Sequence, residues 1–341
     1  MILDAGRVHV SVGCEDGRVA DVRVVSDRPA AARVFVGQGA DRVVAVLPML
    51  FSLCGRAQGA AAAAAIAAAR GAPPPPALEG EVLREAMAEH LWRLLMDEQD
   101  AEARSACLLG RQRLADRPAF AAWLAGAAGM PAEEIPGLAE PGRAAEWQQG
   151  DSLLARRSRP LRDTPGLREA VPLLPPMAGP QTLDLSPLLG QGFARLPIWH
   201  GRPAQTGPAA RHRRFAAADW TGRTFLARWI VRLLELGDYA AGRTVEDGQP
   251  GRVAAVAVAP GRGRATVETA RGLLMHEVAL RDDKVADYVI VAPTEWNFHP
   301  EGALKSWLMG HPAGDAAELR AFVGDAVAAL DPCVEWDLLI A

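Results

Sequence analysis

Residues 331–341 have the sequence DPCVEWDLLIA, in which Cys333 directly follows an Asp-Pro pair close to the end of the chain. Far away in the sequence, residues 48–58 have the sequence PMLFSLCGRAQ and contain a second cysteine, Cys54. A turn behind Asp-Pro at the end of a chain is an unusual place for a thiol that only fills space. Because thiolates are the ligands that soft metals prefer, we interpret Cys54 and Cys333 as candidate metal ligands.

The length and composition of the chain are those of an ordinary globular protein. Its 341 residues can form one large hydrophobic core or two smaller ones. Half of the residues are hydrophobic and 23% are charged, a balance that argues against extensive disorder. The formal net charge of -4 provides no attractive field for nucleic acid or for an acidic membrane, so neither partner is expected.

Nothing in the sequence indicates export or insertion into a membrane. The chain passes from Met1 to Asp4 without a basic segment and a following apolar one, which argues against a signal peptide. The longest apolar run, residues 48–69, is mostly alanine and contains polar residues, so it is a poor membrane span. Four scattered cysteines are expected to be reduced, with Cys14 and Cys107 as spectator thiols, and the predicted location is the cytoplasm.

Hydrophobic patterns predict strands near both ends of the chain and helices between them. Alternation predicts a β-hairpin over residues 8–25 and a third short strand over residues 32–36. Helical spacing or alanine content predicts helices over residues 41–51, 58–70, 79–99, 101–115, 118–128, 220–236 and 316–330. Strands are predicted again over residues 253–259, 265–268, 271–280 and 285–291. We expect a single domain, residues 1–341, with a loop-rich and partly flexible middle over residues 129–208.

The two cysteine segments resemble metal-binding motifs of the large subunits of nickel–iron hydrogenases. Residues 331–339 are similar to the ending D-P-C-x-x-C-x-x-H of that family, and residues 51–58 are similar to its C-G-x-C-x-x-A-H segment. In both places this chain has one of the two cysteines. The positions of the missing cysteines and histidines are taken by Phe51, Trp336, Gln58 and Leu339.

A third similarity lies within residues 268–297. It follows the family pattern E-A-P-R-G-x-x-x-H…D-G-K-x-x-x-Y-x-x-V-x-P-[TS]-T-W-N, with Ala270 in place of the proline and Glu295 in place of the second threonine. Residues 204–211, AQTGPAAR, resemble another family segment, E-[TV]-G-P-L-A-R. The resemblance implies an α+β fold like that of the hydrogenase large subunit. We expect a helical core, and N- and C-terminal strands joined in one small sheet around the two cysteines.

The resemblance also implies an altered metal site. A nickel–iron site of this family needs four thiolates, and this chain has two at the matching places, so nickel is not expected. What remains resembles the iron half of the site, which in the family holds iron as Fe(CN)2(CO). By position, Cys54 and Cys333 are the expected iron ligands, and Arg271 and Thr294 are expected to hydrogen-bond the cyanides. A purely structural alternative for Arg271 is a buried salt bridge with Glu268.

The two cysteines do not match equivalent family positions. Cys54 keeps a position that bridges to iron, whereas Cys333 keeps one that is terminal on nickel. Binding of iron by both thiols therefore requires a shifted Cys333 turn or a different second ligand. Glu335 and His276 are the candidates for that ligand.

The departures from the hydrogenase pattern fit an accessory protein. Fewer thiolates hold iron more weakly, which suits a protein that passes its metal on, and the chain ends soon after the motif, without the extension that large subunits lose during maturation. In both features this chain resembles hydrogenase expression/formation proteins of the HupK/HoxV type. The resemblance implies a non-catalytic scaffold that binds iron transiently, with Hyp-type chaperone and iron scaffold proteins and the hydrogenase large subunit as partners. Two alternatives are a catalytic hydrogenase subunit with an aberrant site and a metal-free protein that mimics the large subunit to bind its chaperones.

Overall fold

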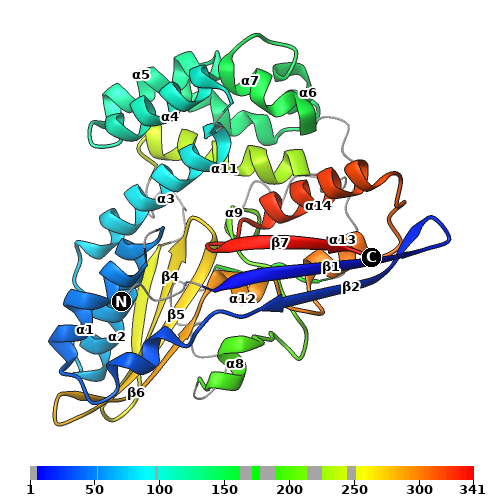
Figure 1. The fold of residues 1–341 in the computed structure, drawn as a ribbon. Helices are drawn as coiled ribbons and strands as arrows, with labels where there is room; N and C mark the ends of the chain where they lie inside the picture. The colour runs from blue at the N-terminus through cyan, green and yellow to red at the C-terminus, as the bar shows by residue number, and fades with distance from the viewer. Residues whose placement is uncertain are drawn as a thin grey trace. The chain divides into compact units, whose positions relative to one another are not determined.

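The structure, a computed structural model, describes residues 6–51, 53–96, 99–161, 171–176, 189–212, 225–243 and 251–341. The chain forms two compact units, each built from segments that are distant in the sequence. Unit 1 comprises Met1–Val82, Arg168–Gly207 and Gly251–Ala341, and unit 2 comprises Leu83–Leu167 and Pro208–Pro250. The elements of both units are labelled in Figure 1.

A three-stranded sheet in unit 1 joins the two ends of the chain. Its strand order is β2-β1-β7, from Arg18–Ser26 (β2), Arg7–Glu15 (β1) and Glu335–Ile340 (β7). β1 and β2 form the predicted antiparallel hairpin, and β7 lies parallel to β1 (Figure 1). The alternate residues Val8, Val10 and Val12 of β1 are buried, as the alternation in the sequence indicated.

The third short strand predicted over residues 32–36 is wrong. These residues form a 3-10 helix instead, η1 (Ala31–Phe35). Its two buried side chains, Ala32 and Phe35, are three positions apart, which is the repeat of a 3-10 turn and not of a strand. The helix predicted over residues 41–51 forms as α1 (Ala40–Val46) followed by the 3-10 helix η2 (Leu47–Leu50).

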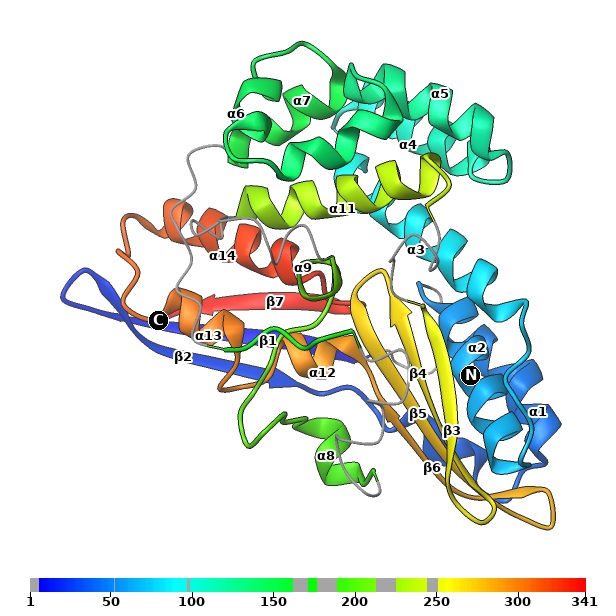
Figure 2. The ribbon, with the colours of Figure 1, turned by 180° about the vertical axis from the view of Figure 1, so that it is seen from behind.

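A second sheet of unit 1 is antiparallel and four-stranded. Its order is β3-β4-β5-β6, from Val253–Ala259, Arg262–Thr269, Gly272–Arg281 and Lys284–Val291. These strands were predicted, but they form a sheet separate from the one that joins the chain ends. The alanine-rich helix α2 (Gly55–Ala69) packs against this sheet (Figure 2). A Cβ atom on Gly263 of β4 would lie 2.1 Å from the carbonyl oxygen of Ala65, so only glycine permits this close approach.

The remaining helices of unit 1 are short, except for the one that precedes the Cys333 segment. They are α8 (Gln191–Arg195), α12 (Pro293–Asn297), α13 (Ala303–Leu308) and α14 (Ala316–Leu330). α14 coincides with the helix predicted over residues 316–330, and it begins with a capping box between Asp315 and Glu318. At its other end Asp331 has a left-handed conformation, with φ 54°, which turns the chain out of the helix.

The described residues of unit 2 are helical. Its helices are α3 (Leu78–Leu95, which begins in unit 1), α4 (Ala101–Arg113), α5 (Arg117–Ala128), η3 (Ala132–Ala139), α6 (Arg143–Trp147), α7 (Leu153–Ser158), η4 (Arg159–Leu161), α9 (Pro208–Arg211) and α11 (Phe225–Ala240). The sequence predicted α3, α4, α5 and α11, but it predicted loops where η3, α6 and α7 form, because these helices are short and lie among prolines and glycines. Residues 162–170, 177–188 and 213–224, which include part of the predicted loop region and the predicted start of α11, lie outside the described residues.

In unit 2, the buried carboxylate of Glu235 has two buried partners, Arg211 and His90. Glu235 accepts a hydrogen bond from Arg211 Nε at 2.7 Å and lies 2.7 Å from His90 Nε2. Burial lowers the pKa of His90 to about 4, although the bond to Glu235 acts in the opposite direction. His90 is therefore a neutral core residue.

Helices combined with two small sheets make this an α+β fold, as the sequence predicted. Within the part of the chain that the structure describes, no helix is both long enough and apolar enough to span a membrane.

Candidate functional site

The turn that contains Cys333 is held by Thr294 of α12. Thr294 Oγ1 lies 3.1 Å from Cys333 Sγ and also accepts the backbone N–H of Cys333 at 3.3 Å. Because the hydroxyl oxygen accepts from the backbone, its single proton is available to the sulfur. Thr294 is buried and Cys333 is half-buried. Two of the four predicted site residues are thus in direct contact.

Arg271 is paired with the same turn. Its Nε lies 3.5 Å from Asp331 Oδ1, and both side chains are almost fully buried. The structural alternative for Arg271 in the sequence was a salt bridge with Glu268. In the structure, Asp331 of the Asp-Pro-Cys segment lies beside this guanidinium. The glycine after Arg271 is required, since Gly272 has φ 127° and a Cβ there would lie 2.4 Å from the Thr206 methyl.

One buried amide connects three separate motif segments. Asn297 Oδ1 accepts the backbone N–H of Thr206 at 2.9 Å, and Asn297 Nδ2 donates to the backbone carbonyls of Arg271 and Leu330, each at 3.3 Å. Leu330 is the last residue of α14 and comes shortly before Cys333. Asn297 therefore fixes the Arg271 turn relative to the Cys333 turn.

Cys54 stands at the N-cap of α2, which begins three residues earlier than the predicted start at residue 58. The unpaired N–H groups and the dipole at a helix N-terminus favour negative charge there. Its Sγ accepts a hydrogen bond from the side-chain amide of Gln58, one turn along the helix, with a nitrogen–sulfur distance of 3.8 Å. Gln58 is buried, whereas Cys54 is half-buried.

A buried chain of hydrogen bonds continues from Gln58 into the four-stranded sheet. Gln58 Oε1 lies 2.9 Å from His276 Nε2 on β5, and His276 Nδ1 lies 2.8 Å from the Tyr288 hydroxyl on β6. Burial lowers the pKa of His276 to about 3 and raises the pKa of Tyr288, so both side chains are neutral. Since Gln58 uses its amide hydrogens on Cys54, its oxygen accepts from His276 Nε2–H, and Nδ1 accepts from Tyr288. Every donor in the chain is therefore directed toward the sulfur of Cys54.

Replacing Tyr288 by phenylalanine is expected to lower the free energy of unfolding by about 1–3 kcal/mol, because His276 Nδ1 would remain buried without a donor. The measurement is urea unfolding followed by circular dichroism. A matched control is Tyr239→Phe, which removes the part-buried hydroxyl that donates to Leu114 O. A loss no larger than that of the control would contradict the role given to Tyr288.

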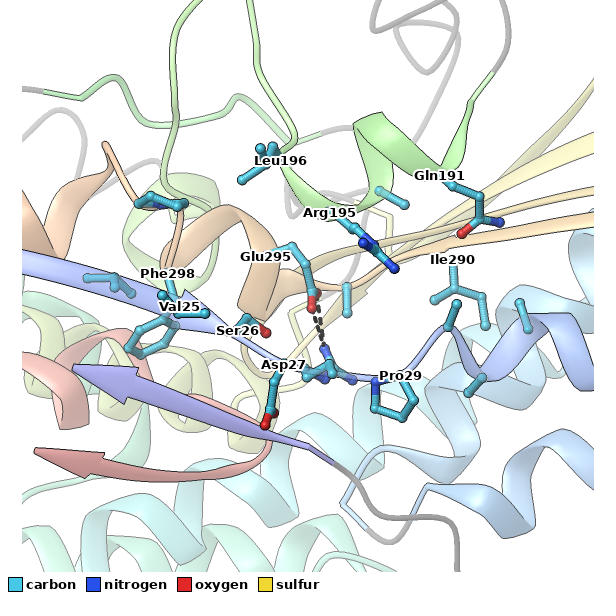
Figure 3. Close-up of a pocket in the computed structure, with 18 of the residues that line it drawn as sticks. Val25, Ser26, Asp27, Pro29, Gln191, Arg195, Leu196, Ile290, Glu295 and Phe298 are labelled. Carbon is cyan, nitrogen blue, oxygen red and sulfur yellow. Dashed lines mark hydrogen bonds and ion pairs between the residues drawn. The ribbon is translucent and has the colours of Figure 1, made fainter. Parts of the chain in front are cut away.

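Arg28, which the sequence analysis did not single out, interacts with both thiols. It follows β2, and its Nη1 donates to the two carboxylate oxygens of Glu295 at 3.0 and 3.2 Å (Figure 3). The two side chains are only 12% and 11% exposed. Burial acts to lower the pKa of Arg28, but the neighbouring groups Cys333, Glu295 and Cys54 outweigh burial, and that pKa is raised. The only signal in the sequence was Glu295, an acid where the family pattern has threonine.

The two residues considered as replacement iron ligands are engaged elsewhere. Glu335 lies on β7, where its side chain is 78% exposed and pairs with Arg7. Both ring nitrogens of His276 are hydrogen-bonded within the buried chain. Among the described residues, no group of three or more His, Cys, Asp or Glu side chains is arranged to hold a metal ion. A metal bound by the two thiols would therefore need further ligands that are not protein side chains.

The residues at the positions of the two missing cysteines are half-buried. Phe51 packs against a core cluster that includes Ala65 and Tyr288. Trp336 lies on β7 in register with Val8 of β1. Neither side chain has an atom that binds a metal, so the four-thiolate arrangement is not available here.

Known proteins that resemble this chain are concerned with hydrogenases. A family model described as nickel-dependent hydrogenase matches residues 226–335. The chain is 33% identical to the hydrogenase expression/formation protein HupK of Azotobacter vinelandii, over 98% of this chain and 99% of that protein. It is 32% identical to the hydrogenase expression/formation protein HoxV of Cupriavidus necator, over 93% of this chain and 92% of that protein.

Solved structures with a similar fold are nickel–iron–selenium hydrogenases. The reduced, active form of the enzyme from Desulfomicrobium baculatum superposes with a TM-score of 0.59 at 15% identity, over 94% of this chain and 95% of that chain. A [NiFeSe] hydrogenase from Desulfovibrio vulgaris Hildenborough gives 0.58 at 14% identity, over 94% of each chain. This likeness concerns the fold, and it confirms the hydrogenase-like α+β architecture that the sequence predicted.

Proposed function

Because this chain belongs to the family of hydrogenase expression/formation proteins that includes HupK and HoxV, we propose that it acts in hydrogenase maturation as a scaffold for iron. In this proposal it transiently holds an Fe(CN)2(CO) unit and passes it to the hydrogenase large subunit. Cys54 and Cys333 are the iron ligands, and Arg271 and Thr294 line the site of the bound unit. The partners are the Hyp-type proteins that assemble the unit and the large subunit that receives it.

The observation that supports the proposal best is the buried guanidinium of Arg28, which pairs with Glu295 next to Thr294 and lies within electrostatic range of both Cys54 and Cys333. Ferrous iron with two thiolates and two cyanides has a net negative charge, and a buried negative charge requires a counter-ion. Arg28 and Arg271 are buried guanidinium groups among the described residues near the two cysteine segments, and each also pairs with a carboxylate. Charge-assisted hydrogen bonds from arginine to an anion are among the stronger polar contacts in proteins.

The small number of protein ligands also favours a carrier. Two thiols leave most coordination positions of iron to other ligands, which the cyanides and the carbonyl would occupy. A site with two thiolates also releases its metal more readily than one with four. Catalysis is not expected, since Phe51 and Trp336 stand where a nickel site needs thiolates.

The test is infrared spectroscopy of the protein purified from its native host without air, together with iron and nickel analysis and a hydrogen uptake assay. We expect cyanide and carbonyl stretching bands, iron without nickel, and no hydrogen uptake or evolution. Iron-free protein without these bands, in a host that matures its hydrogenase normally, would instead support a metal-free interaction protein. Nickel-dependent hydrogen turnover by the isolated chain would support an aberrant hydrogenase subunit.

A further inference from the structure

Unit 1 contains a cavity of about 480 Å³ that reaches Arg28 and Phe51. Its lining comes from the end of β2 and the residues that follow, from α8, and from the region around α12 (Figure 3). Most of the lining is apolar, and the volume is in the range of small-molecule sites. Phe51 stands at the position of a missing cysteine and Glu295 directly follows Thr294, and both line the cavity, so the cavity adjoins the candidate iron site.

Two residues that line this cavity each have a buried hydrogen-bond donor without a hydrogen-bond partner among the described residues. The donors are the hydroxyl of Ser26 and the Nε of Arg28. Buried donors are almost always paired, so an unpaired donor that lines a cavity indicates a ligand that accepts its hydrogen bond. Figure 3 shows Ser26 and Glu295 among the residues that line the cavity, with dashed lines from the Glu295 carboxylate to Arg28.

Glu295 forms hydrogen bonds with only one of the three nitrogens of the Arg28 guanidinium. Glu295 contacts Nη1, on one side of the guanidinium, and Nε belongs to the other side. A guanidinium has five N–H donors in a planar fork and can bind two acceptors from different directions. Burial raises the pKa of Glu295, whereas Arg28 acts to lower it. This carboxylate is therefore protonated more readily than an exposed one.

We propose that Arg28 and Ser26 form a binding site for a small anion with an unhindered acceptor atom, such as the nitrogen of a metal-bound cyanide. Arg271 is engaged by Asp331 and Thr294 by Cys333, so a unit with two cyanides requires donors beyond these two residues. That the natural ligand is a cyanide of the iron unit is an inference that rests on the proposed function. The anion site itself rests only on the cavity and its two donors.

The test uses thiocyanate, a linear anion with a nitrile nitrogen, and the iron-free full-length protein. The nitrile stretching band shifts on hydrogen bonding, so an infrared titration reports binding directly. The wild-type protein is expected to show a saturable, shifted band. Arg28→Lys keeps a cation for Glu295 but lacks the Nε donor, and Ser26→Ala lacks the hydroxyl. Each is expected to weaken binding about ten- to a hundredfold.

Three further variants distinguish this site from general charge attraction. Glu295→Gln is expected to bind thiocyanate more tightly, since it removes the competing carboxylate. Arg70→Leu removes an exposed cation that is paired with Asp41 and Asp283, and it should leave the affinity unchanged. Arg156→Leu removes another exposed cation, which is paired with Glu102, and it should also leave the affinity unchanged. The proposal is overturned if wild-type protein shows no saturable band, or if Arg28→Lys and Ser26→Ala bind as wild type does.

The two proposals fail in different ways. In iron-loaded protein, Ser26→Ala is expected to shift one of the two cyanide bands while its thermal melt stays close to that of the wild type. Thiocyanate binding that depends on Arg28 and Ser26, in a protein whose native form has no cyanide bands, would support the anion site and refute the iron cargo. Cyanide bands in native protein that cannot bind thiocyanate would refute the anion site alone.

Discussion

Cys54→Ala protein purified from the native host is expected to lack iron, and with it the cyanide and carbonyl infrared bands expected of the wild type. Cys54 is one of only two thiols placed to bind the metal, and a single remaining thiolate would hold iron poorly. The fold should persist, since Cys54 makes no side-chain cap bond to α2 and is half-buried. The measurement is iron and infrared intensity per folded protein, with a thermal melt of each sample. Hydrogenase maturation in the host should fall in parallel.

The matched control for this variant is Cys14→Ala. Cys14 is an exposed thiol on β1, so its removal tests whether any surface cysteine affects iron loading. The control should retain the iron of the wild type. Normal iron content in Cys54→Ala would refute the assignment of Cys54 as a ligand, whatever the control shows.

The greatest loss of stability is expected from Glu277→Gln. Glu277 on β5 accepts hydrogen bonds from Arg264 Nη2 at 2.6 Å and from Arg262 Nε at 2.6 Å. The side chains of Arg264 and Glu277 are fully buried, and neutralising one member of such a pair leaves a buried charge without its counter-ion. Breaking a buried pair in this way costs about 3–5 kcal/mol in the free energy of unfolding. Denaturant unfolding followed by circular dichroism measures it.

Two further variants separate the buried charge from packing. The double variant Arg264→Met/Glu277→Leu removes both fully buried charges at once, and Arg262 keeps its ion pair with Asp287. Its loss should therefore be much smaller than that of Glu277→Gln. Glu301→Gln breaks an ion pair with Lys305 in which Glu301 is largely exposed, and it should cost less than about 1 kcal/mol. Equal losses in the single and double variants would show that packing, and not charge, determines the stability of this sheet.

Local patterns in the sequence were sufficient for most of the fold. The alternation over residues 8–25 predicted the hairpin of β1 and β2, because a strand with one buried face must alternate. The alanine-rich run predicted α2, and α14 was predicted within its observed bounds. The pattern failed over residues 32–36, where a run of five residues is too short to distinguish a strand from a 3-10 turn.

The motif segments also predicted part of the candidate site. Cys333, Thr294 and Arg271 were selected by position alone, and the structure brings all three to the turn after α14. Motifs can predict site residues because each motif gives the residue types that lie together in a site. They do not record which contacts those residues make, and the contact of Arg271 with Asp331 came only from the folded chain.

The sequence by itself therefore determined the local elements, the two thiols and the loss of the other two cysteines. Only the tertiary structure brought Arg28 and Glu295 together, since they are 267 positions apart and no local pattern connects them. The same is true of Gln58 and His276, which are 218 positions apart. The physical reason is that burial, and not sequence spacing, forces these polar groups to pair. A charge or an amide removed from water must find a partner wherever the packing of distant segments provides one.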